Sequence, residues 1–245
     1  MRSFCARMAD ELDECEEEPI HEDEVVLSLL YPHWRAGTLP INHLDANIFP
    51  TAFESPRVQF TIENGNTHEQ FTGWVVVPGK YLYGMKAFYE AEGLMPGSLI
   101  HIKRSNKPGE VIISTEKSRS NREWIRTALF GADGGIVFAL LKQPVSVTYD
   151  ERMAILIPDH EALDGLWTTP PKAKGGFEQL VVNTLHDLAK LNPQGHVHAQ
   201  ELYSAINIMK RMPVAPIVAT LVSHPQIKYV GDYYFRIADG EEESK

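Results

Sequence analysis

The C-terminal part of the chain carries the pattern that most restricts how the protein can fold. From Phe177 onward, apolar residues such as Leu180, Leu185 and Leu188 recur at steps of three and four, as one face of an amphipathic helix requires. Proline and glycine then divide the remainder into short segments. The pattern predicts three helices followed by a β-hairpin, over residues 177–191, from about His198 to Pro213, over 214–223 and over 227–237.

Residues 25–115 are typical of a small β-barrel. Residues 58–62 alternate apolar and polar side chains, and residues 71–77 are rich in β-forming types. Between these runs, Asn64-Gly65 is the signal of a tight hairpin. Further strands are expected over 24–30, 99–103 and 110–114, with an irregular stretch over 31–40 and one helix over 84–92.

Residues 116–170 connect these two regions and carry weaker signals. A helix is predicted over 121–129, where Trp124, Ile125 and Leu129 are apolar, and β-strands are predicted over 136–147 and 153–157. Residues 168–176 have the composition of a linker, so the clearest domain boundary is placed there.

The net charge of −10 is concentrated at the two ends of the chain. Residues 1–24 carry −8 and residues 239–245 carry −3, which leaves the body at about +1. Such ends are expected to be disordered and solubilising, although an acidic arm that competes with nucleic acid for a basic surface is an alternative. No run is apolar and long enough for a membrane span or a signal peptide, and the only cysteines, Cys5 and Cys15, lie in the acidic leader, so a cytoplasmic location is expected.

The three helices and the hairpin follow the element order of a winged helix. The segment His198-Ala199-Gln200-Glu201-Leu202 and the closing residues 231–237 resemble winged helices of the HARE type, found in the delta subunit of bacterial RNA polymerase. The third helix, residues 214–223, lacks the Arg, Lys, Asn or Gln with which a recognition helix reads bases. The resemblance therefore implies either phosphate contacts or docking of RNA polymerase or another protein; the cations available are Lys210, Arg211, Lys228 and Arg236.

A second resemblance covers residues 25–115. Gly37-Thr38-Leu39-Pro40, Gly73-Trp74-Val75-Val76 and Leu94-Met95-Pro96-Gly97-Ser98 resemble the pseudobarrel DNA-binding domain of plant auxin-response factors, a fold shared with restriction-endonuclease recognition domains. This chain departs from that family in placing Tyr-Gly before the helix and Gly-Ser in the turn after it. In the family, two arms clamp the major groove. By position, the first arm would contain His33, Trp34 and Arg35, and the second would surround Lys80; the alternative is a generic barrel with exposed cations.

The two resemblances and the residue patterns together define the expected organisation. The fold class is α+β, with a small β pseudobarrel, a linking α/β-hairpin segment and a C-terminal winged helix-turn-helix. The expected parts are an acidic disordered leader (1–24), the pseudobarrel-like domain (25–115), the helix and hairpin segment (116–170), the winged helix (176–238) and an acidic tail (239–245).

Residues 101–126 form the most basic stretch of the chain, with a net charge of +4. On the predicted helix, Arg119, Arg122 and Arg126 would share one face and could bind phosphates. A solvated helix face is the alternative. The cations of this stretch are Lys103, Arg104, Lys107, Lys117, Arg119, Arg122 and Arg126.

We found no residue pattern typical of an active site or a cofactor site. His186, His196 and His198 are the only clustered metal-ligand types, but no cysteine or further close ligand accompanies them. The chain has no nucleophile elbow, phosphate-binding loop or paired carboxylates in a catalytic context. We therefore expect no enzyme activity, no cofactor and no metal.

These observations favour a DNA-binding regulatory protein that acts in transcription and contacts double-stranded DNA through the barrel arms and the basic helix. Two alternatives remain open. One is a protein-interaction adaptor of transcription or anti-phage machinery that does not contact DNA. The other is the recognition subunit of a restriction-type enzyme.

Overall fold

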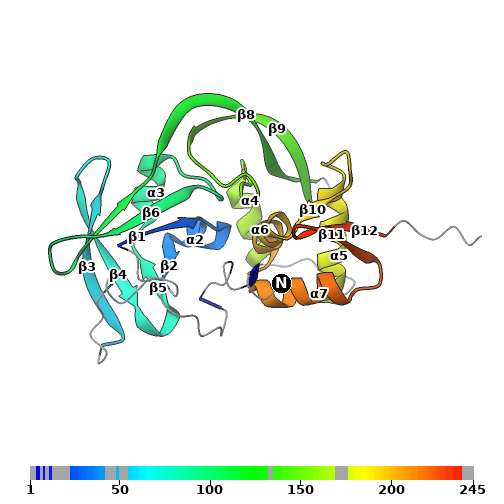
Figure 1. The fold of residues 1–245 in the computed structure, drawn as a ribbon. Helices are drawn as coiled ribbons and strands as arrows, with labels where there is room; N and C mark the ends of the chain where they lie inside the picture. The colour runs from blue at the N-terminus through cyan, green and yellow to red at the C-terminus, as the bar shows by residue number, and fades with distance from the viewer. Residues whose placement is uncertain are drawn as a thin grey trace, which may run out of the picture.

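The structure is a computed structural model that describes residues 4–5, 8, 11–12, 23–41, 48–49, 55–131, 135–168 and 176–238. Figure 1 shows a curled β-sheet on one side, a group of helices on the other, and a long two-stranded arch above both. The α+β class predicted from the sequence is confirmed.

A seven-stranded sheet forms the first half of the molecule. Its strands lie in the order β1-β6-β7-β3-β4-β5-β2, and all neighbours are antiparallel except β3 and β7. The strands are β1 (Glu24–Ser28), β2 (Thr38–Pro40), β3 (Arg57–Asn64), β4 (Gln70–Val76), β5 (Tyr81–Tyr83), β6 (Leu99–Arg104) and β7 (Glu110–Ser114).

Alternate side chains of this sheet point into one apolar core, around which the sheet curls. Phe60 and Ile62 of β3, Val75 of β4, and Ile100 and Ile102 of β6 are almost completely buried. The residues between them on β3 and β4 face outward, which is the period-two pattern of a half-buried strand. With α3 (Lys86–Glu92) the sheet forms a curled half-barrel, so the predicted β-barrel is confirmed to that level.

The stretch expected to be irregular, residues 31–40, contains α2 (Tyr31–Ala36) and β2. Pro32 lies in the first turn of α2, where proline is tolerated, and Gly37 ends the helix with a φ of 65°. A Cβ on Gly37 would lie 2.6 Å from the Cβ of Lys86, so the approach of α2 to α3 also requires glycine here. The signals for a helix start and stop were present, but six residues are too few to show a helical period.

The predicted helix over residues 121–129 is wrong, because this segment belongs to the strand β8 (Lys117–Phe130). It pairs along its length with β9 (Ile136–Val147), which was predicted as a strand. The apolar spacing of Trp124, Ile125 and Leu129 is compatible with a helix, but it is equally compatible with a fourteen-residue strand that pairs with a long neighbouring strand. Tertiary pairing has overridden a weak local signal.

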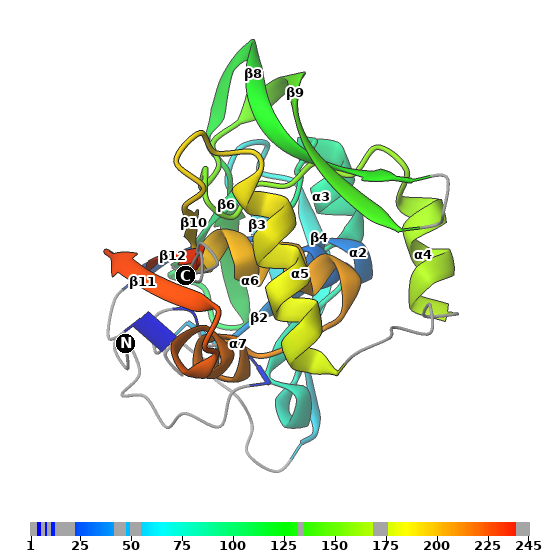
Figure 2. The ribbon, with the colours of Figure 1, turned by 90° about the vertical axis from the view of Figure 1, so that its right-hand side faces the viewer.

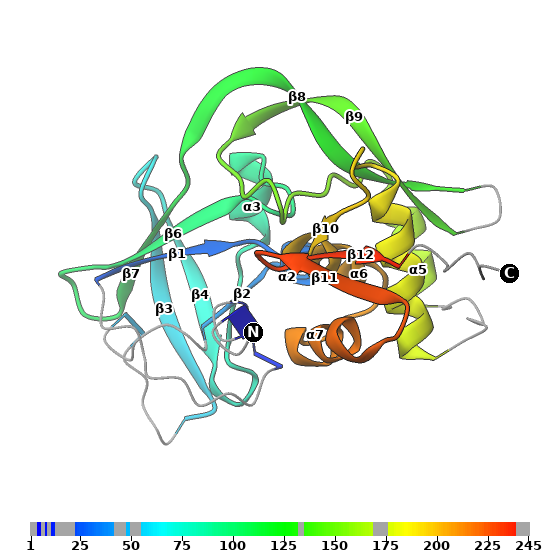
Figure 3. The ribbon, with the colours of Figure 1, turned by 45° about the vertical axis from the view of Figure 1, so that its right-hand side comes forward.

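The β8–β9 arch changes the face that it buries along its length. Near its base, Ile125 and Val145 pack into the barrel core, whereas farther along Ala128 and Phe138 pack against the helices. Because strands twist, a long ribbon can present opposite faces to two neighbours. Figure 3 shows the arch rising from the sheet and descending beside the helices.

The segment after the arch also differs from expectation. The strand predicted over residues 153–157 is a loop with a single β-bridge, in which Leu156 pairs with Thr127 of β8. The loop leads into α4 (His160–Thr168), a helix that the sequence did not predict. Residues 169–175, most of the predicted linker, lie outside the described residues.

The C-terminal helices and hairpin are present as predicted. The elements are α5 (Phe177–Ala189), β10 (Val197–His198), α6 (Ala199–Met209), α7 (Val214–Ser223), β11 (Ile227–Gly231) and β12 (Tyr234–Ile237), and the three strands form a sheet in the order β10-β12-β11. Leu185, Leu202, Ile206, Ile217 and Phe235 are fully buried between these elements. Figure 2 shows α5, α7 and the hairpin at the front of the molecule.

Two apolar cores hold the molecule together, and the helical core extends beyond residues 176–238. It also contains Tyr31 of α2, Met153 and Ile155 of the loop, and Leu163 of α4. Of the predicted acidic leader, Phe4 is 3% exposed and stacks on Tyr233. The predicted domain boundaries stay predictions, and the predicted tail, residues 239–245, lies outside the described residues.

Candidate nucleic-acid interface

Arg35 and Arg211, which were predicted to contact nucleic acid, form ion pairs with carboxylates, and the Arg35 pair is half-exposed. Arg35 forms a bidentate ion pair with Asp164, with its Nε 2.8 Å from Oδ1. This hydrogen bond raises the pKa of Arg35 and lowers the pKa of Asp164. Arg211 Nη2 lies 2.8 Å from Glu11 Oε1. Because both guanidinium groups already have carboxylate partners, we remove them from the candidate interface.

Arg126 is also mostly buried and paired. The expected helical face carrying Arg119, Arg122 and Arg126 does not exist, because the segment is a strand. The Arg126 side chain is 11% exposed and its Nη2 lies 3.2 Å from Glu201 Oε1. Its Nη1 donates to the carbonyl oxygens of Arg152 and Ala154. Arg126 therefore joins the arch to α6 and is not a phosphate contact.

The first predicted arm, residues 33–35, is part of the packed helix α2. His33 is 4% exposed, and the Trp34 indole donates from Nε1 to the Leu94 carbonyl oxygen at 2.6 Å. Lys86 Nζ lies 4.6 Å from the centre of the Trp34 ring. The helix capped by Gly37 fixes these side chains against the body. Residues 33–35 are therefore a packed helical segment, and their assignment to a DNA-clamping arm stays a prediction.

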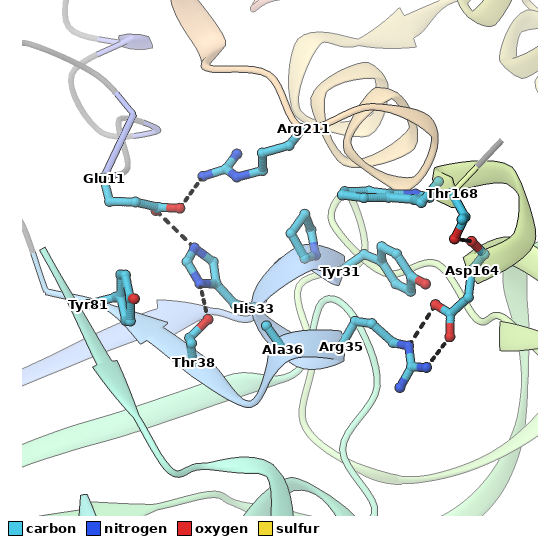
Figure 4. A pocket seen from close by; sticks show the side chains of 12 residues that line it. Glu11, Tyr31, His33, Arg35, Ala36, Thr38, Tyr81, Asp164, Thr168 and Arg211 are labelled. Atoms are coloured by element: carbon cyan, nitrogen blue, oxygen red, sulfur yellow. Dashed lines mark hydrogen bonds and ion pairs between the residues drawn. The ribbon is translucent and has the colours of Figure 1, made fainter. Parts of the chain in front are cut away.

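A cavity of about 680 Å³ lies beside α2 (Figure 4). On its wall His33 Nδ1 is 2.9 Å from Thr38 Oγ1, and His33 Nε2 is 2.9 Å from Glu11 Oε2. Burial would raise the pKa of Glu11, but the hydrogen bond from His33 and the charges of His33 and Arg211 outweigh it and lower this pKa to about 2. A hydroxyl–imidazole–carboxylate chain can relay a proton. Here it also satisfies both nitrogens of a buried imidazole, so we assign it a structural role.

Five cations lie in two groups at strand ends of the sheet. Arg57 begins β3, and Lys80 follows the 3-10 turn η1 (Val77–Gly79) where β4 ends, so these two residues form one group. Lys103 and Arg104 end β6, and Lys107 lies in the following turn. The register places Arg104 beside Val111, and Val111 beside Ile62, which is five residues along β3 from Arg57. We call the two groups together the cationic end.

All five residues of the cationic end are exposed. Lys107 Nζ lies 3.3 Å from Glu110 Oε2, and the other four form no ion pair with any described residue. Asp23 and Glu24 lie beside Arg104 and Lys103, and Glu24 is hydrogen-bonded to His101 at 2.9 Å. The cationic end therefore consists of two groups of mostly unpaired positive charge.

The remaining predicted contacts lie elsewhere. Arg119 and Arg122 are exposed on the arch, which leaves the sheet from the opposite end of β7. Lys210 and Lys228 are exposed on the helical half. None of these four forms an ion pair with a described residue. The structure thus does not gather the eleven predicted cations on one surface.

The outer face of α7 is apolar. Ala215, Ala219 and Val222 are exposed there, and Tyr229 and Val230 are exposed on the neighbouring strand β11. No side chain of α7 offers the bidentate hydrogen bonds used to read base edges. This surface is suited to protein contact more than to base recognition.

A hollow of about 370 Å³ on the outer face of the sheet was not predicted from the sequence. It is lined by Arg57, Trp74, Val76, Tyr81 and Tyr83, and we call these residues the aromatic hollow. The alternation along β4 indicated that Trp74 and its neighbours take opposite faces, but not which face was buried. Gly73 shows which face is buried, because a Cβ there would lie 2.9 Å from both Ile62 and Leu82. Gly73 therefore faces the core and Trp74 faces outward.

His198, one of the three histidines considered as metal ligands, caps α6. It is 1% exposed, and its Nδ1 accepts a hydrogen bond from the backbone N–H of Gln200 at 3.2 Å. Burial, followed by the charge of Arg152, lowers the pKa of His198 to about 4. Within the described ranges, no three His, Cys, Asp or Glu side chains are grouped to hold a metal ion.

This lowered pKa makes stability depend on pH. In the unfolded chain His198 takes up a proton near its ordinary pKa of 6.5, whereas in the folded state it does so only near pH 4. The folding stability that the neutral form of His198 contributes is therefore fully present above pH 6.5 and is lost as the pH falls toward 4. We expect His198 to account for about 2 kcal/mol of the stability lost between about pH 7 and about pH 5.

The substitution His198→Asn keeps an N-cap acceptor and removes the titrating group. Chemical denaturation at both pH values should show a smaller acid loss in this variant than in the wild type. Equal losses in the two proteins would show that other groups cause the acid sensitivity.

Comparisons of the chain with protein-family models, with curated proteins and with solved structures found no match. In the part of the chain that the structure describes, no helix combines the length and the apolar character needed to cross a membrane. A functional assignment therefore depends on the geometry of the surface itself.

Proposed function

We propose that this protein binds double-stranded DNA through the cationic end of its half-barrel and acts in transcription regulation. The observation that carries the proposal is that Arg57, Lys80, Lys103 and Arg104 are exposed on the half-barrel without carboxylate partners among the described residues. Clustered cations bind the phosphate backbone and give a strong dependence on salt.

The second predicted arm supplies part of this surface. After η1, Lys80 has a φ of 50°, and its carbonyl oxygen accepts a hydrogen bond from the Ile41 backbone N–H at 2.9 Å. The turn is thus tied to the sheet while the Lys80 side chain extends into solvent. A short, anchored turn with an exposed lysine is suited to contact a phosphate near a groove.

We further propose that α5, α6 and α7, with the sheet β10-β12-β11, form a winged helix that docks a protein partner such as RNA polymerase. The apolar outer face of α7 supports this assignment, as does the absence of base-reading side chains on that helix. Lys210 and Lys228 could add phosphate contacts at the edge of this surface.

Removing charge from the cationic end should weaken duplex binding and its salt dependence. In the variant Lys80→Gln/Lys103→Gln/Arg104→Gln, we expect the slope of log affinity against log salt to fall by about one for each phosphate that the protein no longer neutralises. Fluorescence anisotropy with a labelled random duplex of about 20 base pairs measures both quantities.

Two control variants locate the interface. Lys190→Gln removes one exposed charge from the C-terminal cap of α5, where Lys190 pairs with Asp187, and should leave the slope unchanged. Arg119→Gln/Arg122→Gln tests the arch. If the arch variant lost the salt dependence and the triple variant kept it, the assignment to the cationic end would be wrong.

A protein-interaction adaptor without DNA contact is the second candidate function. It is favoured by the exposed apolar residues Val222, Tyr229 and Val230 on the helical half. Failure of the whole chain to bind any duplex at low salt would favour this candidate. The restriction-type recognition subunit differs from the main proposal only in its partner, since it would use the same cationic end.

A further inference from the structure

The aromatic hollow presents three aromatic side chains that have no partners among the described residues. Trp74 is 40% exposed and Tyr83 is 55% exposed, and these two residues face each other across β4 and β5. Neither they nor Tyr81 contact another aromatic ring or donate a hydrogen bond within the described part of the chain. Exposed aromatic rings grouped on one sheet face are a feature that binding surfaces share.

The shape of the hollow is fixed by its neighbours. A Cβ on Gly79 would lie 2.4 Å from Cε1 of Tyr81, so the Tyr81 ring lies directly against the turn η1. Tyr81 and Val76 are paired across β5 and β4, and Arg57 is paired with Val76 on the other side. The rings are therefore carried by a paired sheet and a tight turn, and the hollow does not depend on a loose loop.

The charge of the hollow selects its ligand. Arg57 is exposed and unpaired among the described residues, and no carboxylate lines the hollow in the part of the chain that the structure describes. Arg57 also belongs to the cationic end, so the hollow opens beside the proposed path of a phosphate backbone. An aromatic surface with an adjacent free cation suits a ligand that combines a planar ring with a phosphate.

We infer that the aromatic hollow binds an unpaired nucleotide of a nucleic-acid strand. Its base stacks on Trp74 and Tyr83, and its phosphate contacts Arg57. Stacking on aromatic side chains tolerates any base, since every base has a flat π-face. The inference rests on the proposed function, because the rest of the strand is held by the cationic end, and it adds that the strand has an unpaired segment at this face.

Single-strand binding by a Trp74→Ala variant tests the inference. The probes are a labelled thymidine oligonucleotide of about 20 nucleotides and a labelled duplex of similar length, both measured by anisotropy at low salt. Trp74→Ala should weaken single-strand binding by about tenfold or more, whereas Trp74→Phe should keep most of it. Tyr83→Ser should weaken it in the same direction, and duplex binding should change little.

Trp124→Ala is the matched control, because Trp124 is 67% exposed on the arch and lies outside both hollow and cationic end. It should leave single-strand affinity unchanged. Circular dichroism confirms that each variant folds, and quenching of tryptophan fluorescence by the oligonucleotide should be reduced in Trp74→Phe.

The outcomes separate this inference from the proposed function. Unchanged single-strand affinity in both Trp74→Ala and Tyr83→Ser overturns the inference while duplex binding by the cationic end stands. Equal weakening of duplex binding would make Trp74 a groove contact and also overturns it. Equally tight binding of free thymidine monophosphate would overturn the strand as the source of the nucleotide. If the wild type binds neither probe at low salt, the proposed function is wrong, and the inference that rests on it is wrong as well.

Discussion

Replacing Arg126 by Met is expected to lower the free energy of unfolding by about 3–5 kcal/mol. The Arg126 guanidinium lies between the arch and α6, where it pairs with Glu201 and donates to two carbonyl oxygens of the loop after the arch. Burial raises the pKa of Glu201, and the charge of Arg126 opposes that rise. Without Arg126, the carboxylate is left buried and unpaired or must take up a proton.

Denaturant titration measures this destabilisation, and two variants control for it. Arg122→Met removes a charge from the same strand at an exposed position and should change stability by less than about 0.5 kcal/mol. Arg126→Met combined with Glu201→Gln removes both charges and should recover part of the stability. A stable Arg126→Met protein with weakened DNA binding would contradict the role assigned to Arg126.

Replacing Gly97 by Ala should destabilise the protein by more than about 3 kcal/mol, because three segments meet at this residue. Its φ is 95°, and a Cβ would lie 2.4 Å from the Cα of Ala154. Its N–H donates to the Leu29 carbonyl oxygen at 2.7 Å, and its own carbonyl oxygen accepts from the Asp150 N–H at 2.9 Å. A side chain at Gly97 would therefore push the turn that carries it away from the loop after the arch.

Gly93→Ala is the matched control for Gly97→Ala. Gly93 also has a positive φ, of 67°, but no atom lies within 4 Å of the position that a Cβ would take. The cost in this variant is that of the left-handed backbone alone, about 1 kcal/mol. Thermal unfolding should therefore separate the two variants clearly, and similar melting temperatures would contradict the packing described at Gly97.

Local sequence signals, such as flanking prolines, a capping residue or side-chain alternation, were enough to predict several elements. The helix α7 was predicted over residues 214–223, and it spans Val214–Ser223, because prolines flank it on both sides. The start of α6 was placed at His198, which caps it. In the first half, the alternation of side chains along β3 and β4 was enough to predict strands.

Long-range pairing decided what the sequence could not. The segment 121–129 is a strand because β9 pairs with it, and no property of the segment alone indicates this. Arg35 and Arg211 look like free cations in the sequence, but their partners Asp164 and Glu11 lie 129 and 200 residues away. Ion pairs of this kind leave no trace in the local sequence pattern.

The candidate interface likewise depends on topology. Arg57 and Lys80 lie together because β4 returns antiparallel beside β3, whereas the parallel pairing of β7 with β3 places Lys103 and Arg104 farther along the sheet. The basic stretch 101–126 was correctly seen to be rich in cations, but the structure divides it between the cationic end, the arch and the interior.

The central claim is that the cationic end binds the phosphate backbone of DNA, and the salt dependence of duplex binding by the whole chain tests it most directly. Anisotropy of a labelled random duplex should show binding at about 50 mM salt that weakens by about a hundredfold at about 200 mM, as expected for roughly four phosphate contacts. No binding at the lower salt concentration, or an affinity that does not change with salt, would contradict the claim.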